Sequence, residues 1–175
     1  DVLIVGAGVV GCSVAFQLAR RGVRRVAIVE RERIPGSGST SKANGGIRAQ
    51  FTTKVNVAMS LRSMEILDAL AEEIGEPPVY HKAGYLFLTA SRERLVAMER
   101  AVAFQRSLGV TVELLDRDDA LRLAPFVAGA DLVGGTFGAR DGFIDPGALA
   151  GFFLREATRA GVELACGAEV LAIDR

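Results

Sequence analysis

Three glycines near the start of the chain have the spacing of a dinucleotide-binding loop. Gly6, Gly8 and Gly11 fit the pattern G-x-G-x-x-G. The first glycine permits a tight turn, the second a close approach of the backbone to a pyrophosphate, and the third close packing of a helix on a strand. The N-terminus of the helix that follows offers free N–H groups and a partial positive charge to the phosphates. The pattern alone is weak evidence, so its context has to support it.

A carboxylate lies at the distance that such a loop requires. Glu30 follows Gly11 by nineteen positions and ends an apolar run. In this position a carboxylate can accept hydrogen bonds from both ribose hydroxyls of an adenosine, and its charge disfavours a 2′-phosphate. The alternative interpretation is a solvated glutamate at a strand end. Together with the glycines, Glu30 predicts a site for the ADP part of NAD or FAD.

The elements around these residues form the expected frame. Residues 2–5 are a continuous apolar run, which predicts a central parallel strand buried on both faces. Residues 14–21 have the pattern of a helix that ends at Gly22, and residues 26–29 predict a second buried strand. Strand, helix and strand make one βαβ unit, which is the context that the glycine pattern needs.

The rest of the chain predicts further helices and strands. Helices are expected over 53–74, 91–107, 117–123 and 146–160, with Ser91 and Asp145 as N-caps and Gly75 and Pro77-Pro78 after the first of them. Strands are expected over 112–115, 132–137, 162–165 and 169–173, and a hairpin or bent strand over 79–89 around Gly84. This order predicts an α/β fold in which a Rossmann-like domain, with helices on both faces of a parallel sheet, carries part of an α+β domain.

Polar residues after the second strand favour FAD over NAD. A plain NAD domain would continue there with a helix and a strand, but residues 37–48 are rich in Ser, Thr and Gly. Hydroxyls and glycine amides can line a pyrophosphate and let a flavin ring approach the backbone. The other interpretation of this segment is a flexible linker.

Four segments together resemble the D-amino-acid oxidase superfamily of flavoproteins. They are Gly6 to Gly11, Glu30-Arg31, the stretch from Gly38-Ser39-Thr40 to Gly45-Gly46-Ile47-Arg48, and Asp141-Gly142-Phe143-Ile144-Asp145-Pro146. Within the superfamily, the closest likeness is to the group of sarcosine oxidase, dimethylglycine dehydrogenase and glycine oxidase. The resemblance implies an FAD-binding domain in two segments, 1–75 and 141–175, and a partial substrate domain over 76–140. It also implies that a C-terminal half is absent, so that this piece alone is expected to be inactive.

The resemblance also implies the residues of the site. Lys42 stands where some relatives attach the flavin through a histidine, so FAD is expected to bind non-covalently. Arg48 is expected to hold a substrate carboxylate in bidentate fashion, unless it is an ordinary salt-bridging arginine. The expected cofactor-binding residues are Gly6, Gly8, Val9, Val10, Gly11, Glu30, Arg31, Ser39, Thr40, Ser41, Asn44, Gly45, Gly46, Ile47 and Val170.

These residues lead to a functional hypothesis with alternatives. We expect oxidation of a C–N bond in an amino acid or N-methylated amine, with hydride transfer to the flavin. The alternatives are a flavin-dependent dehydrogenase of 2-hydroxy acids or glycerol phosphate, an NAD-binding module without flavin, and a non-catalytic subunit that holds FAD. The only histidine, His81, and the buried-type Cys12 are interpreted as structural.

Composition limits the partners and the compartment. The 21 basic and 21 acidic side chains balance, which gives no electrostatic reason to expect nucleic acid or an anionic membrane. No apolar stretch is long enough to span a bilayer, and no metal-ligand spacing is present. The two cysteines favour a reducing compartment, the cytoplasm, over a disulfide scaffold. Partner subunits or a homo-oligomer stay open.

Overall fold

The computed structural model describes residues 1–74, 80–127, 129 and 131–174 and divides them into two compact units. The first unit holds residues 1–45 and 144–174, and the second holds 46–74 and most of 80–143. These boundaries differ from the expected ones, because the helix after residue 53 groups with the middle of the chain. The expected helix end at Gly75 and the prolines Pro77 and Pro78 lie outside the described residues.

The first unit is built on a parallel sheet, which agrees with the predicted fold class. Its elements are β1 (Val2–Val5), α1 (Val9–Arg20), β2 (Val26–Glu30), the short 3₁₀ turn Thr40–Lys42, α5 (Pro146–Arg159) and β8 (Glu163–Cys166). The strand order is β1-β2-β8, with both pairs parallel. The two ends of the chain thus contribute neighbouring strands to one sheet.

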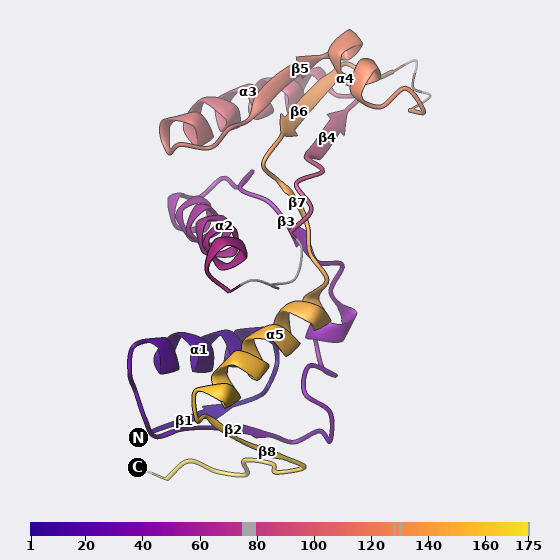
Figure 1. Cartoon of the computed structure of the whole chain (residues 1–175). Helices are drawn as coiled ribbons and strands as arrows, with labels where there is room; N and C mark the ends of the chain where they lie inside the picture. The colour runs from indigo at the N-terminus through magenta and orange to yellow at the C-terminus, as the bar shows by residue number, and fades with distance from the viewer. Residues whose placement is uncertain (75–79, 128, 130, 175) are drawn as a thin grey trace. The chain divides into compact units, whose positions relative to one another are not determined.

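Helices α1 and α5 lie side by side on one face of this sheet (Figure 1). Phe16 on α1 packs against Phe152 and Phe153 on α5, with ring centroids 6.1 and 5.3 Å apart. Asp145 caps α5 by accepting a hydrogen bond from the Ala148 amide at 2.9 Å, and Pro146 begins the helix, as predicted.

The prediction that β1 is buried on both faces was wrong. Leu3 and Val5 are each 60% exposed, whereas Ile28 on β2 is fully buried. Leu3 and Val5 alternate with Ile4, which faces α1, so they point away from the helices. Within the described residues, β1 also pairs with β2 alone. An apolar run shows that a strand is present but not how many faces are covered.

The second unit contains an antiparallel sheet with helices. Its elements are β3 (Gly46–Ile47), α2 (Lys54–Glu73), β4 (Tyr85–Thr89), α3 (Arg92–Ser107), β5 (Glu113–Asp116), α4 (Arg117–Leu123), β6 (Gly134–Gly138) and β7 (Gly142–Phe143). The three long strands pair in the order β4-β6-β5, and β3 pairs antiparallel with β7. Val57 and Met64 of α2 share a buried cluster with Val102 of α3.

Several element boundaries differ from the expected ones. Helix α1 begins at Val9 rather than at residue 14, because the glycine loop leads directly into it. No strand forms over 169–173 in the described residues up to 174. Around Gly84 only β4 is a strand, and His81 makes an isolated bridge to Phe143. Strands β3 and β7 were not predicted, since two-residue strands carry too little pattern.

Candidate functional site

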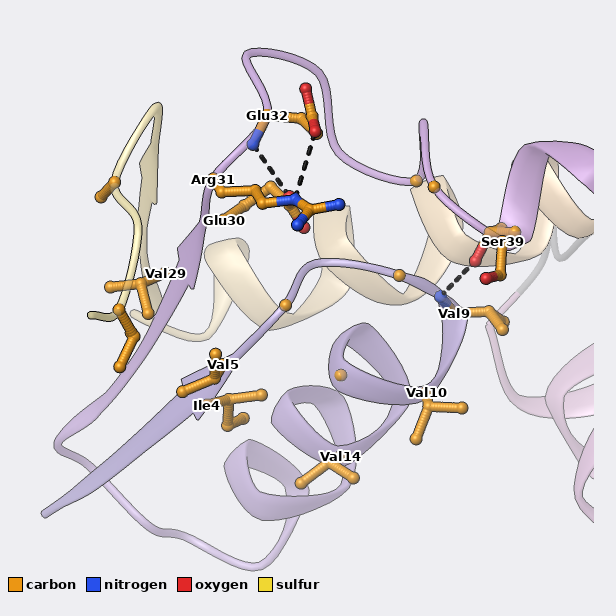
Figure 2. Close-up of a pocket in the computed structure, with 18 of the residues that line it drawn as sticks. Ile4, Val5, Val9, Val10, Val14, Val29, Glu30, Arg31, Glu32 and Ser39 are labelled. Carbon is orange, nitrogen blue, oxygen red and sulfur yellow. Dashed lines mark hydrogen bonds and ion pairs between the residues drawn. The ribbon is translucent and has the colours of Figure 1, made fainter. Parts of the chain in front are cut away.

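The glycine loop opens onto a cleft in the first unit. The cleft has a volume of about 840 Å³, within the range of small-molecule sites. Figure 2 shows Val9 and Val10 at the start of α1 on one side of it, and Glu30, Arg31 and Glu32 at the end of β2 on the other. One side is the start of α1, which follows the carboxyl end of β1, and the other is the carboxyl end of β2. Ligands bind at the carboxyl ends of the strands in such folds.

Two of the three glycines are required by the local geometry. Gly6 has φ +99°, a left-handed conformation that favours glycine. A side chain at Gly11 would collide with the carbonyl oxygen of Gly6 and lie 3.3 Å from a methyl carbon of Ile4, so α1 packs closely on β1. Both features fit the roles expected from the sequence.

Thr40 closes the start of α1. Its Oγ1 accepts a hydrogen bond from the Val9 amide at 3.0 Å, and a Cβ at Gly8 would lie 3.1 Å from the same oxygen. Thr40 is buried, although it comes from the loop 31 residues further along the chain. The amides of Val10 and Gly11 have no acceptor within the helix. Both residues line the cleft, as does Thr40.

The carboxylate of Glu30 connects β2 with the glycine loop. Its Oε2 accepts a hydrogen bond from the Ala7 amide at 2.7 Å, and its Oε1 accepts one from the Glu32 amide at 3.0 Å. These two amides, that of Glu32 first, lower the pKa of Glu30 below its usual range. The side chain therefore stays ionised at neutral pH and presents a fixed negative charge at the edge of the cleft.

The remaining predicted residues of the first unit divide into two groups. Ser39, Arg31 and Val170 line the cleft, and Arg31 also pairs with Glu32 at 3.2 Å. Ser41 does not line it, and its hydroxyl donates to the carbonyl oxygens of Ser37 and Gly38. Asn44 and Gly45 are also absent from the lining. The carbonyl oxygen of Gly45 accepts from the Ile144 amide at 3.0 Å.

Arg48 lies in the second unit, beside a hollow of about 510 Å³ that Gly46 and Ile47 also line. Its guanidinium carbon is 5.1 Å from the ring centre of Phe51, 5.6 Å from that of Tyr85 and 5.3 Å from that of Phe87. Such distances are within the range of cation–π interactions. Within the described residues the guanidinium makes no hydrogen bond or ion pair, so the expected alternative of an ordinary salt-bridging arginine does not hold there.

A buried polar network lies next to Arg48 and was not predicted from the sequence. Asp141, only 1% exposed, accepts hydrogen bonds from the Ala49 amide and from Nε2 of Gln50, both at 2.9 Å. Gln50 also donates to the Tyr85 carbonyl oxygen and accepts from the Thr136 hydroxyl at 2.7 Å. Burial raises the pKa of Asp141, while Gln50, Ala49 and the charge of Arg48 oppose that rise. Asp141 begins one of the four segments that resemble the superfamily, but no sequence pattern indicated its hydrogen bond with Gln50.

The residues interpreted as structural behave as such. The ring of His81 stacks on Phe143 with centroids 4.8 Å apart. Cys12 is buried, its Sγ lies 3.4 Å from the Ala7 carbonyl oxygen, and burial raises its pKa to about 11. In the described part of the chain, no cluster of His, Cys, Asp and Glu could hold a metal, and no helix is long and apolar enough to cross a bilayer.

Comparison with known proteins places the chain. It is 36% identical over 173 residues to FAD-dependent oxidoreductase domain-containing protein 1 of Xenopus laevis, which covers 93% of this chain and 34% of that protein. The crystal structure of L-proline dehydrogenase from P. horikoshii superposes with a TM-score of 0.90 at 30% identity, covering 97% of this chain and 44% of that one. Glycine oxidase from Geobacillus kaustophilus gives a TM-score of 0.86 at 34% identity, covering 99% and 48%.

The chain thus spans less than half the length of each of these relatives. The family model for FAD dependent oxidoreductases, DAO, matches residues 1–175. This match includes the glycine loop, Glu30 and Arg48 and agrees with the predicted superfamily. The chain belongs to the DAO family of FAD-dependent oxidoreductases.

Proposed function

We propose that the cleft of the first unit binds the ADP part of FAD without a covalent bond. The observation that carries this proposal is the ionised Glu30 carboxylate, held by the Ala7 and Glu32 amides across the cleft from the start of α1. Each carboxylate oxygen keeps a lone pair that can accept from a ribose hydroxyl. Arg31 and the backbone near Val170 flank the adenosine, because both line the same cleft.

The pyrophosphate is assigned to the start of α1. The partial positive charge of a helix N-terminus and the amides of Val10 and Gly11 suit a phosphate. The Thr40 oxygen already accepts from Val9, so its proton is available to donate to a phosphate oxygen. Gly8 leaves space there that a side chain would reduce, and Ser39 adds a second hydroxyl at the cleft. The residues present therefore fit the group.

We further propose that the substrate is an amino acid or an N-methylated amine and that Arg48 binds its carboxylate. When bound, FAD supplies the chemistry of accepting a hydride from the C–H bond beside nitrogen. Arg48 provides orientation, because three rings restrict its guanidinium while it makes no ion pair with the described residues. The family pattern alone supports five further proposed flavin contacts. Two of them, Gly46 and Ile47, line the hollow beside Arg48. The other three, Ser41, Asn44 and Gly45, do not line the first cleft.

An absorption spectrum of the full-length protein tests the cofactor. Bands at about 370 and 450 nm are expected for oxidised flavin. Precipitation with acid should release the flavin into the supernatant if it is held non-covalently. A colourless protein that binds NAD would overturn the assignment. The cytoplasmic location and any subunit assembly, expected from the sequence, stay predictions.

Kinetics of Arg48→Ala test the substrate class. We expect KM for a carboxylate-bearing amine to rise by about 10- to 100-fold, which is the loss of a charge-assisted hydrogen-bond pair, and KM for a simple amine to change little. Arg48→Lys keeps the charge but not the bidentate geometry, so it should raise KM for the carboxylate-bearing amine less than Arg48→Ala does. Equal effects on both substrates would contradict a carboxylate role, and activity on glycerol phosphate or 2-hydroxy acids alone would favour the alternative dehydrogenases.

A further inference from the structure

Arg48 is held by its surroundings rather than by a direct ionic partner. Phe51 is three residues further along the chain, and Tyr85 and Phe87 are alternate residues of β4, so their rings share one face of that strand. The attraction of a cation to aromatic faces acts on the guanidinium and not on the backbone of Arg48. Something else has to fix the backbone from which Arg48 extends.

The backbone on both sides of Arg48 is fixed by the segment around Asp141. Before it, Ile47 pairs with Gly142 in the two-residue ladder of β3 and β7. After it, the Ala49 amide donates to Oδ1 of Asp141 and the Gln50 side chain donates to Oδ2. One short segment of the chain, residues 141–143, therefore holds residues 46–50 by both backbone and side-chain bonds.

The Asp141 carboxylate is closely packed by Gly138 and Gln50. A Cβ at Gly138 would collide with Oδ2 of Asp141, so a glycine is required at that position. Gln50 is in turn held by Thr136 on β6 and by the Tyr85 carbonyl on β4. Tyr85 also supplies one of the rings over Arg48. The network thus connects the backbone of Arg48 with the strand that carries two of its three aromatic contacts.

We propose that Asp141 is a positioning residue for Arg48, whose guanidinium it holds at the hollow through Ala49, Gln50 and Tyr85. The inference deepens the proposed function, since positioning matters for substrate only if Arg48 binds a carboxylate. Asp141 suits this role because it accepts two hydrogen bonds from residues next to Arg48. Its charge also acts on Arg48 without forming a direct ion pair that would compete with a ligand.

Nuclear magnetic resonance of the full-length protein tests the positioning itself. The Nε–H signal of Arg48, assigned with Arg48→Lys in protein labelled with [15Nε]arginine, should be displaced by the ring currents of three aromatic rings. In Asp141→Asn the new amide would face two N–H donors, so the signal should move toward that of exposed arginines. An unchanged Arg48 signal in a folded Asp141→Asn protein would overturn the proposal.

A milder variant and a matched control separate positioning from general destabilisation. Thr136→Val removes only the hydrogen bond to Gln50 and should displace the Arg48 signal less than Asp141→Asn does. Thr89→Val removes another buried hydroxyl of the same sheet, whose bonds run to Ser91. It should leave the Arg48 signal in place even if it lowers thermal stability. Displacement by Thr89→Val as large as that by Thr136→Val would overturn the proposal.

Acetate binding links the positioning to the proposed function. The perturbation of flavin absorbance gives the dissociation constant of acetate, and neutral acetamide is the control ligand. We expect Asp141→Asn to weaken acetate about tenfold when Arg48 is present and less than about twofold when Arg48 is already alanine. Equal weakening in both backgrounds would show that Asp141 does not act through Arg48 and would overturn the inference.

The two readouts keep the two proposals distinguishable. If Arg48→Ala leaves acetate binding unchanged while Asp141→Asn displaces the Arg48 signal, the carboxylate role is wrong and the positioning is supported. If Arg48→Ala weakens acetate but Asp141→Asn changes neither the signal nor the affinity, the positioning is wrong and the carboxylate role is supported.

Discussion

Two carboxylates, one in each unit, accept the same number of hydrogen bonds and have opposite pKa shifts. Glu30 accepts from the Ala7 and Glu32 amides beside an open cleft, and its pKa is lowered. Asp141 accepts from the Ala49 amide and the Gln50 side chain inside the second unit, and its pKa is raised. The donors favour the charged form in both cases, so burial decides the sign.

This difference separates a charge available to a ligand from a charge used by the scaffold. Water and ligand hydroxyls can reach Glu30, so its remaining lone pairs can be used in binding. Asp141 is enclosed, and its bonds serve to fix neighbouring backbone. We therefore expect substitutions at Glu30 to change cofactor affinity and substitutions at Asp141 to change stability, and the following predictions test that contrast.

The largest effect on stability is expected from Asp141→Ala. It leaves the Ala49 amide and the Gln50 side chain without their buried acceptor, which should cost about 2–4 kcal/mol of unfolding free energy. Urea denaturation of the full-length protein measures it. Asp118→Ala is the control, because that side chain is 80% exposed and its pair with Arg117 is 3.7 Å long. A loss no larger than that of the control would refute the scaffold role.

Glu30→Ala should chiefly weaken FAD binding. Loss of charge-assisted hydrogen bonds to the ribose should raise the dissociation constant about 10- to 100-fold. The buried Ala7 amide loses its acceptor as well, but truncation at the open edge of the cleft lets water replace the carboxylate, so the apoprotein should lose less stability than with Asp141→Ala. Titration of the apoprotein with FAD, followed by flavin fluorescence, gives the constant. Glu32→Gln is the control, because Glu32 lines the same cleft and the substitution keeps the backbone amide that donates to Glu30. This variant should bind FAD normally. Unchanged retention in Glu30→Ala would rule out the ribose role.

Thr40→Val should have a smaller effect on the same constant. Valine fills the space of threonine but neither accepts from the Val9 amide nor donates to a phosphate, so we expect FAD to bind about five- to tenfold more weakly. Thr40→Ser keeps the hydroxyl and should stay within about twofold of the original affinity. If serine and valine weaken FAD equally, the hydroxyl is not what matters at this position.

The smallest effect should appear in the dependence of stability on pH. The lowered pKa of Glu30 means that its contribution is fully present above the usual titration range of glutamate and is lost as pH falls through its pKa in the folded protein. The raised pKa of Asp141 has the opposite sign, so its contribution is present at low pH and is lost as pH rises.

Thermal denaturation of the apoprotein over a range of pH values measures both contributions. Glu30→Gln should remove the component that weakens on acidification, and Asp141→Asn should remove the component that weakens as pH rises. The same sign of change in both variants would mean that burial does not separate the two carboxylates as described.

The sequence by itself determined the frame of the cofactor site. A strand, three spaced glycines, a helix and a strand ending in Glu30 are local features, and each is fixed by backbone sterics or by residue spacing. Capping residues were equally local: Ser91 and Asp145 accept hydrogen bonds from the third residue beyond them, as predicted. The family pattern added Arg48 and the polar loop to this frame.

Tertiary structure decided which of these residues meet. Thr40 closes helix α1 from 31 residues away, and Asp141 holds Gln50 from 91 residues away. The exposed face of β1 and the missing strand over 169–173 have the same origin, since burial and strand pairing depend on neighbours that are distant in sequence. Spacing along the chain specifies local geometry, whereas buried hydrogen bonds between distant segments form only where the fold brings donor and acceptor together.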